Sequence, residues 1–177
     1  DYYASRGLGD VYKRQDAEGR EEPLFAFTPH GYDLTVDTDA YQTASNNRVD
    51  VIFEEHMRTQ ERLDCPVLVG EWGAGDGKLE EIPHLAHLLD LFDRNLWSQT
   101  YWAYATEKLD RPLMDLLSRP YPQAVTGHIR SFCYDREKRL FTLEYEQDRA
   151  YSAPTVIYLP RPFQSCLLYT SPSPRDA

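Results

Sequence analysis

Apolar and polar residues follow two different periods along this chain. Short unbroken apolar runs over Leu24–Thr28 and Val67–Val69 predict strands, and a third strand is predicted over Trp97–Tyr104. An unbroken run is typical of a strand that is buried on both faces, as in a parallel sheet. The second run ends abruptly at a carboxylate, Glu71, which is unusual at the end of a buried strand.

Between these strands the apolar residues recur every three or four positions, which predicts amphipathic helices. The first helix is predicted over Val49–Leu63, after Asn46 and Asn47, which supply helix-capping chemistry. The second is predicted over Pro83–Asn95, with its proline in the first turn. Strand, helix, strand, helix and strand with short connections indicate a βαβαβ unit and a parallel sheet.

This run has too few residues for a complete eight-stranded barrel, which takes about 250. We therefore expect an α/β fold in which residues 16–110 are the C-terminal portion of a (β/α)8 TIM barrel. After Asp110 the prolines predict a linker, and alternating segments predict a hairpin and a further strand. These segments are Arg130–Tyr134, Leu140–Glu146 and Thr155–Leu159. We expect residues 111–165 to form a small, partial all-β sandwich domain.

The two ends of the chain have an unusual relation to each other. One DNA duplex, translated on opposite strands, can encode both Gly9–Arg14 and Leu167–Ser171, and the match continues outward on both sides. Both ends resemble a translated transposase sequencing adapter. We therefore expect residues 1–15 and 166–177 to be adapter-derived rather than native.

The composition excludes several classes of function. The chain has 29 acidic and 19 basic residues and a formal net charge of −10. This charge disfavours binding to nucleic acid or to an anionic membrane surface. No apolar run is long enough to span a bilayer, so we expect no integral membrane segment. Cys65 and Cys133 are expected to be packed thiols rather than a disulfide, which leaves the compartment undetermined.

Residues that could take part in catalysis or substrate binding lie at the three predicted strands. His30 and Tyr32 come after the first strand, Glu71 after the second and Trp102 within the third. Because parallel strands end at the same edge of a sheet, these side chains are expected to meet in one cleft. The set suits glycoside cleavage, in which one carboxylate attacks the anomeric carbon and a second, roughly 5–5.5 Å away, protonates the leaving oxygen. An aromatic ring can stack against the sugar.

Each of these residues also has a simpler interpretation. Glu71 could cap the following loop, His30 could be a loop histidine bonded to backbone, and Tyr32 could be half-buried in the core. Trp102 and Trp72 could each be either core residues or sugar-stacking residues. The spacing leaves these alternatives open.

No metal or phosphate site is predicted. His84 and His87 lie three apart on a predicted helix but have no third ligand nearby, so we expect ordinary exposed histidines. The glycines at 73–77 do not form a phosphate loop, because Lys78 is followed by Leu79. We expect no cofactor.

Three motifs carry a resemblance to a known family. Phe-Thr-Pro-His-Gly-Tyr-Asp at 27–33, Val-Leu-Val-Gly-Glu-Trp-Gly at 67–73 and Tyr-Trp-Ala-Tyr at 101–104 resemble the last three barrel strands of glycoside hydrolase family 5. The closest resemblance is to the endoglycoceramidase-like branch of this cellulase-like family. That branch also carries a C-terminal β-sandwich, introduced by a segment similar to residues 118–125. The resemblance covers nearly all of Pro23–Leu159.

The resemblance implies specific roles. Glu71 would be the nucleophile, Tyr32 its hydrogen-bond partner, His30 a substrate-site residue and Trp102 the sugar-stacking platform, with Trp72 a further substrate-binding candidate. The acid/base glutamate of the family follows an asparagine on the fourth strand, and this chain contains no such strand. The remaining acids, among them Glu54, Glu55 and Glu107, do not match that motif.

We therefore expect a fragment of a retaining β-glycosidase that acts on glycolipids such as glycosylceramides or steryl glucosides. The fragment itself is expected to be inactive, because it lacks the acid/base strand. The alternatives are a cellulase- or mannanase-like polysaccharide hydrolase of the same clan and a non-catalytic carbohydrate-binding protein. The parent is expected to be a monomer, and a secreted or extracytoplasmic location is compatible with the sequence.

Overall fold

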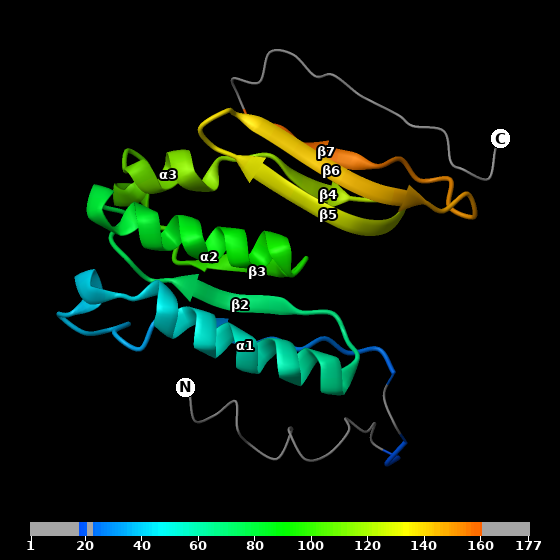
Figure 1. Ribbon diagram of the computed structural model, residues 1–177, viewed down its shortest axis with the longest axis horizontal. Coiled ribbons are helices and arrows are strands. Elements are labelled where there is room, and N and C mark those ends of the chain that lie inside the picture. The colour runs from blue at the N-terminus through cyan, green and yellow to red at the C-terminus, as the bar shows by residue number, and fades with distance from the viewer. Residues whose placement is uncertain (1–17, 21–22, 161–177) are drawn as a thin grey trace.

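The computed structural model describes residues 18–20 and 23–160 of the 177-residue chain. The two ends that we predict to be adapter-derived, residues 1–15 and 166–177, lie outside these described residues. A sheet with covering helices forms the first part of the fold, and antiparallel strands form the second (Figure 1).

A three-stranded parallel sheet organises the first part. It contains β1 (His30–Gly31), β2 (Leu68–Gly73) and β3 (Ser98–Trp102) in that order, so β2 is central. Both neighbours pair with β2 in parallel, which confirms the predicted parallel sheet. All three strands therefore end at the same edge.

The first strand begins later than predicted. Phe27 forms an isolated parallel bridge with Val67, and β1 follows at His30. Leu24 is 88% exposed. The prediction of a strand starting at Leu24 is wrong because pairing with the neighbouring strand begins only at Phe27, whose N–H donates to the carbonyl of Pro66 at 2.9 Å.

Two long helices cover one face of the sheet. α1 (Asn46–Leu63) and α2 (Ile82–Arg94) confirm the predicted helices to within three residues at each end. The two helices contact each other. The core between them and the sheet consists of buried apolar residues: Val49, Phe53, Val67, Val69, Trp72, Leu85, Leu88, Leu89, Leu91, Phe92, Trp97, Leu113 and Leu116.

Histidine side chains join the two helices. His84 Nδ1 lies 2.9 Å from Asn46 Oδ1, and His87 Nε2 lies 2.7 Å from Asp50 Oδ1. His84 is buried, so the expectation that both histidines are exposed is wrong. Packing of α2 against α1 turns these side chains into the helix interface, a contact that the sequence of one helix does not reveal.

Short helical turns connect the main elements. They are η3 (Tyr41–Thr43), η4 (Leu79–Glu81) and η5 (Thr106–Lys108). A further helix, α3 (Pro112–Leu117), replaces the predicted linker. Proline is favoured in the first turn of a helix, and Leu113 and Leu116 are buried, which explains why this segment is helical.

The second part of the chain consists of two antiparallel strand pairs. β4 (Tyr121–Ala124) pairs with β7 (Val156–Tyr158), and β5 (Gly127–Asp135) pairs with β6 (Leu140–Gln147). The predicted hairpin is confirmed by the second pair. Cys133 on β5 is exposed, so the expectation that it is packed is wrong, whereas Cys65 is buried; both thiols are free.

The strand pairs contact the sheet and its helices through α2, which runs alongside β5 (Figure 1). Arg119 donates from Nη1 and Nη2 to the two carboxylate oxygens of Asp93 on α2, each at 2.6 Å. Both side chains are only 6% exposed. Among the described residues, no helix is both long and apolar enough to cross a membrane.

Candidate active site

Backbone alternation on β1 directs two predicted site residues to one side. Successive side chains of a strand point to opposite faces, so His30 and Tyr32 share a face and Gly31 points the other way. A Cβ on Gly31 would lie 3.1 Å from the ring of Phe53 on α1 and 3.2 Å from Val69. The glycine therefore lets the helix pack closely behind the two site residues.

A bulge in β2 determines where Glu71 points. Val69 is opposite Gln99 on β3, but Trp72 is opposite Tyr101, so β2 contains one more residue than its partner between these pairs. Without the extra residue, Glu71 would face the core with Val69. Bulges re-aim side chains in this way and occur often beside functional sites. Here the bulge places Glu71 on the open face.

The structure brings Tyr32, His30 and Glu71 together. The Tyr32 hydroxyl donates to Glu71 Oε2 at 3.0 Å, and His30 Nδ1 lies 3.4 Å from the same oxygen. The rings of His30 and Tyr32 meet edge to face, with their centroids 6.0 Å apart. Burial and the carboxylate of Glu71 both raise the pKa of Tyr32 above its ordinary value. The phenol therefore remains a hydrogen-bond donor at neutral pH.

Both contacts reach only one oxygen of Glu71. Within the described part of the chain, Oε1 has no hydrogen-bond partner. One carboxylate oxygen is thus held by neighbours while the other remains available to a ligand in the cleft.

Trp102 lies across the same cleft, which has a volume of about 710 Å3. Its side chain is 54% exposed, and its carbonyl accepts the N–H of Ala74 at 2.9 Å. The peptide bond between Trp102 and Ala103 is cis. The cleft is lined by Thr28, Pro29, His30, Tyr32, Asp33, Leu34, Val36, Asp37, Ile52, His56, Glu71, Ala74 and Trp102.

Trp72 is not part of the cleft. It is fully buried and packs edge to face against Phe92 and Tyr101. Its indole N–H donates to Gln99 Oε1. The proposed substrate contact of Trp72 is therefore corrected to a core role, because the bulge that exposes Glu71 turns the next residue inward.

Several cleft residues did not emerge from the sequence. His56 on α1 is one: its Nε2 lies 3.1 Å from the carbonyl oxygen of His30, and burial lowers its pKa. Asp33, Leu34, Val36 and Asp37 come from the loop between β1 and α1. Helical spacing relative to Phe53 could have placed His56 near the sheet, but the loop offered no pattern.

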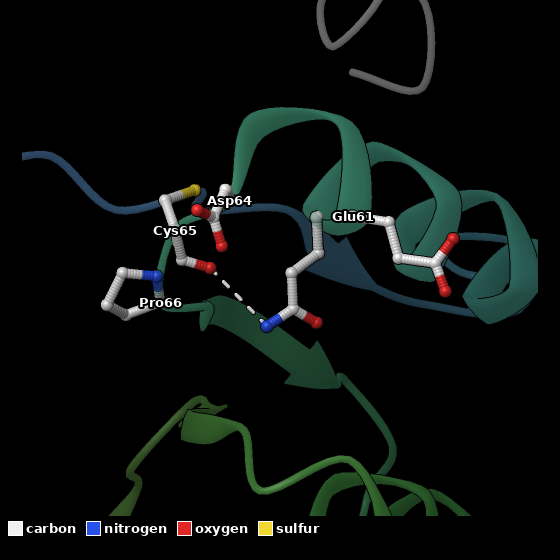
Figure 2. Close-up of a pocket in the computed structure, with 5 residues that line it drawn as sticks. Glu61, Asp64, Cys65 and Pro66 are labelled. Carbon is white, nitrogen blue, oxygen red and sulfur yellow. Dashed lines mark hydrogen bonds between the residues drawn. The ribbon is translucent and has the colours of Figure 1, made fainter.

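A second hollow lies at the opposite end of the sheet, where β2 begins. Figure 2 shows it beside the last turn of α1, with Gln60 Nε2 donating to the carbonyl of Cys65 at 3.4 Å. Its lining residues are Gln60, Glu61, Asp64, Cys65 and Pro66. In α/β barrels the amino-terminal ends of the strands serve stability rather than chemistry, so we do not regard this hollow as the site.

The loop after β2 is held from three directions. The hydroxyl of Tyr41 donates to the carbonyl of Gly73 at 2.5 Å, and Tyr101 and Lys108 both donate to that of Gly75, at 3.2 and 3.0 Å. Gly73 has a φ of +91°, and a Cβ there would lie 2.2 Å from the Tyr101 ring. The rim beside Glu71 is therefore a fixed structure.

No metal-binding group is present among residues 18–20 and 23–160: they contain no cluster of three or more His, Cys, Asp or Glu side chains that could hold an ion.

Solved structures similar to this chain include several of endo-glycoceramidase II from Rhodococcus sp. Its complex with a cellobiose-like imidazole has a TM-score of 0.67 and 23% identity, and its lactosyl-enzyme intermediate has a TM-score of 0.66 and 24% identity. Its ganglioside GM3 complex has a TM-score of 0.60 and 21% identity. Each match covers 88% of this chain and 38% of the other, so the shared fold extends over less than half of that enzyme.

Two family models match this chain, whereas a comparison with curated proteins found no match. The family model for the glycoside hydrolase family 5 C-terminal domain matches residues 119–169. The model for cellulase, glycosyl hydrolase family 5, matches residues 11–108, more than half of the chain. This chain belongs to glycoside hydrolase family 5.

Proposed function

We propose that Glu71 is the nucleophile of a retaining β-glycosidase and that Tyr32 holds it in position. The observation that carries this proposal is the 3.0 Å hydrogen bond from Tyr32 to one oxygen of Glu71 at the edge of a substrate-sized cleft. In the retaining mechanism a carboxylate attacks the anomeric carbon and forms a covalent glycosyl-enzyme, which water then hydrolyses.

The remaining groups fit the same reaction. Oε1 of Glu71 forms the bond to the anomeric carbon while Oε2 keeps the hydrogen bond from Tyr32. His30, 3.4 Å from Oε2, borders the sugar. The exposed face of Trp102 offers an apolar plate for the C–H groups of a sugar ring.

Acid/base catalysis needs a second carboxyl group, and the described cleft offers none that fits. Asp33 is buried and ion-paired, and Asp37 is a loop residue rather than a strand-end glutamate. We infer that the acid/base residue belongs to a part of the barrel not contained in this chain, and that this chain by itself does not complete turnover. In this proposal residues 16–110 supply the last three barrel strands and residues 111–165 a β-sandwich, in a monomeric parent.

A glycolipid is the substrate class that we favour. Leu34, Val36 and Ile52 give one wall of the cleft an apolar character that an acyl chain could contact. The similar enzyme from Rhodococcus sp. is named an endo-glycoceramidase and has been solved with a ganglioside. The cellulase family model favours a polysaccharide as the second candidate. A non-catalytic binding protein would require neither Tyr32 nor Glu71, so the bond between them argues against it.

An activated inhibitor tests the nucleophile without the acid. A dinitrophenyl 2-deoxy-2-fluoro-β-glucoside has a leaving group that departs without protonation, and its fluorine slows hydrolysis of the glycosyl-enzyme. We expect the full chain to gain the mass of one fluoroglucosyl group, mapped to Glu71 by peptide mass spectrometry. Glu71→Gln should remain unlabelled, and Glu61→Gln, an exposed acid on α1, should label normally.

Two outcomes would contradict the proposal. Labelling that survives Glu71→Gln, or that maps to another residue, would exclude Glu71 as the nucleophile. Steady turnover of an ordinary aryl glycoside that is lost in Asp37→Asn would show that the chain carries its own acid/base group. A parallel comparison of glucosylceramide and a soluble β-glucan with the full-length parent separates the two substrate classes.

A further inference from the structure

Glu71 holds the hydroxyl of Tyr32 and His30 meets its ring edge to face, but neither contact fixes the Tyr32 backbone. The next residue, Asp33, begins the loop that runs to Ser45 at the start of α1. Leu34, Val36 and Asp37 of this loop line the cleft. The conformation of one peptide segment therefore determines both the phenol that meets the nucleophile and one wall of the cleft.

Asp33 belongs to the lining of the cleft, but its carboxylate is completely enclosed. Its side chain is 0% exposed. The carboxylate accepts five hydrogen bonds. They come from Thr35 N at 2.9 Å, Thr35 Oγ1 at 2.7 Å, Ser45 N at 3.0 Å, Arg48 Nε at 2.9 Å and Arg48 Nη2 at 2.8 Å. Both ends of the loop and the first turn of α1 thus meet at one side chain.

The charge of Asp33 is retained despite its burial. Burial by itself raises the pKa of a carboxyl group, but the bonds from Arg48, Ser45 and Thr35 together outweigh burial and hold the pKa of Asp33 well below its ordinary range. A buried carboxylate is tolerated only when it is paired and fully hydrogen-bonded, as it is here. Replacing Arg48 by a neutral residue would leave this buried charge without its cation, one residue from Tyr32.

The far side of the loop is anchored as well. Tyr41 donates its hydroxyl to the carbonyl of Gly73, two residues after Glu71. Arg48 Nη2 also donates to the carbonyl of Thr43 at 2.8 Å. The loop is therefore fixed at its base through Asp33 and near its end through Tyr41.

We infer that Asp33 and Arg48 are positioning residues that hold the Tyr32 hydroxyl on Glu71. The inference rests on the proposed function for its catalytic meaning, but the geometry that it describes can be measured separately. Adjacent residues share a peptide bond, so a fixed Asp33 carboxylate fixes the direction in which the Tyr32 side chain leaves the backbone. Neither residue touches the substrate, and both act through Tyr32.

The test uses the full chain with 13C at the phenolic carbon of tyrosine. Tyr32→Phe assigns the Tyr32 resonance, and Glu71→Gln gives its position without a carboxylate acceptor. We expect Asp33→Asn and Arg48→Lys to move the Tyr32 resonance toward its Glu71→Gln position. Asp39→Asn, an exposed acid of the same loop, should leave it unchanged.

A second readout follows the chemistry. In Arg48→Lys the maximal rate of fluoroglucoside labelling should fall about 10-fold with half-saturation unchanged, which is less than the roughly 100-fold attributed to a 1 Å misplacement. If Asp33→Asn does not fold, Arg48→Lys and Thr35→Val, which removes one hydroxyl donor, provide the same comparison.

The two proposals fail in different ways. An unmoved Tyr32 resonance in folded Asp33 and Arg48 variants, with faster amide exchange confined to residues 34–44, would overturn the inference and leave a merely structural ion pair. Absence of labelling in the unaltered chain would instead overturn the glycosidase proposal, while the resonance shift would still decide the positioning role.

Discussion

The ion pair between Arg119 and Asp93 provides the sharpest stability prediction. Replacing Arg119 by Met keeps much of the buried aliphatic volume but removes two hydrogen bonds of 2.6 Å each. Asp93 is then left without its cation at a site where both side chains are only 6% exposed, so water cannot replace the partner. Breaking a buried pair from one side typically costs about 3–5 kcal/mol.

The loss of folding stability in Arg119→Met should depend on pH in a defined direction. Burial already raises the pKa of Asp93 despite the bonds from Arg119, and removing Arg119 raises it further. The folded variant then binds a proton more readily than the unfolded chain, so its stability increases as the pH falls. We expect the deficit of Arg119→Met to be largest at neutral pH and to shrink on acidification toward 3.8, the ordinary pKa of Asp93.

Urea denaturation followed by circular dichroism at several pH values measures both effects. Adding Asp93→Leu to the variant should recover part of the loss, because an apolar pair of similar volume is often tolerated in place of a buried ion pair. Arg58→Gln, which removes an exposed pair on α1, is the control and should cost less than about 1 kcal/mol. A deficit below 1 kcal/mol for Arg119→Met, or a double variant no more stable than the single one, would refute the reasoning.

Three further predictions concern the core and the cleft. Gly73→Ala should destabilise the fold by roughly 2 kcal/mol or more in urea denaturation, because its φ of +91° disfavours a side chain and its Cβ would meet the Tyr101 ring at 2.2 Å; equal stability would contradict this packing. Phe53→Ala should cost about 3–5 kcal/mol, since its ring is fully buried, and a loss below 1 kcal/mol would place the ring outside the core. Trp102→Phe should abolish most acrylamide-quenchable fluorescence, because Trp72 and Trp97 are buried; an unchanged quenchable fraction would mean that another indole is exposed.

Several elements of the fold could be predicted because their signals are local. The apolar stripes of α1 and α2 and the turn between β5 and β6 are specified by neighbouring residues, and all three are confirmed. The start of the first strand and α3 were missed. In the first case apolar character extends beyond the paired residues, and in the second the prolines of Pro112–Pro122 suggested a linker although Pro112 begins a helix.

The candidate site was predictable to the extent that its residues lie at strand ends. Tyr32 and Glu71 are 39 positions apart, yet parallel strands bring their ends to one edge, and their contact at 3.0 Å follows from that rule. His56 and Asp33 could not be found in this way. They act through packing between α1 and the sheet and through a loop whose ends meet only after folding.

The sequence by itself determined the order of strands and helices, the positions of the carboxylate and the phenol, and the family to which the motifs belong. Only the tertiary structure decided which way β2 turns its side chains. Simple alternation directs Trp72 to the open face and Glu71 to the core, and one extra residue relative to β3 reverses both. A bulge depends on pairing with neighbouring strands, which is not encoded in the local pattern of apolar and polar residues.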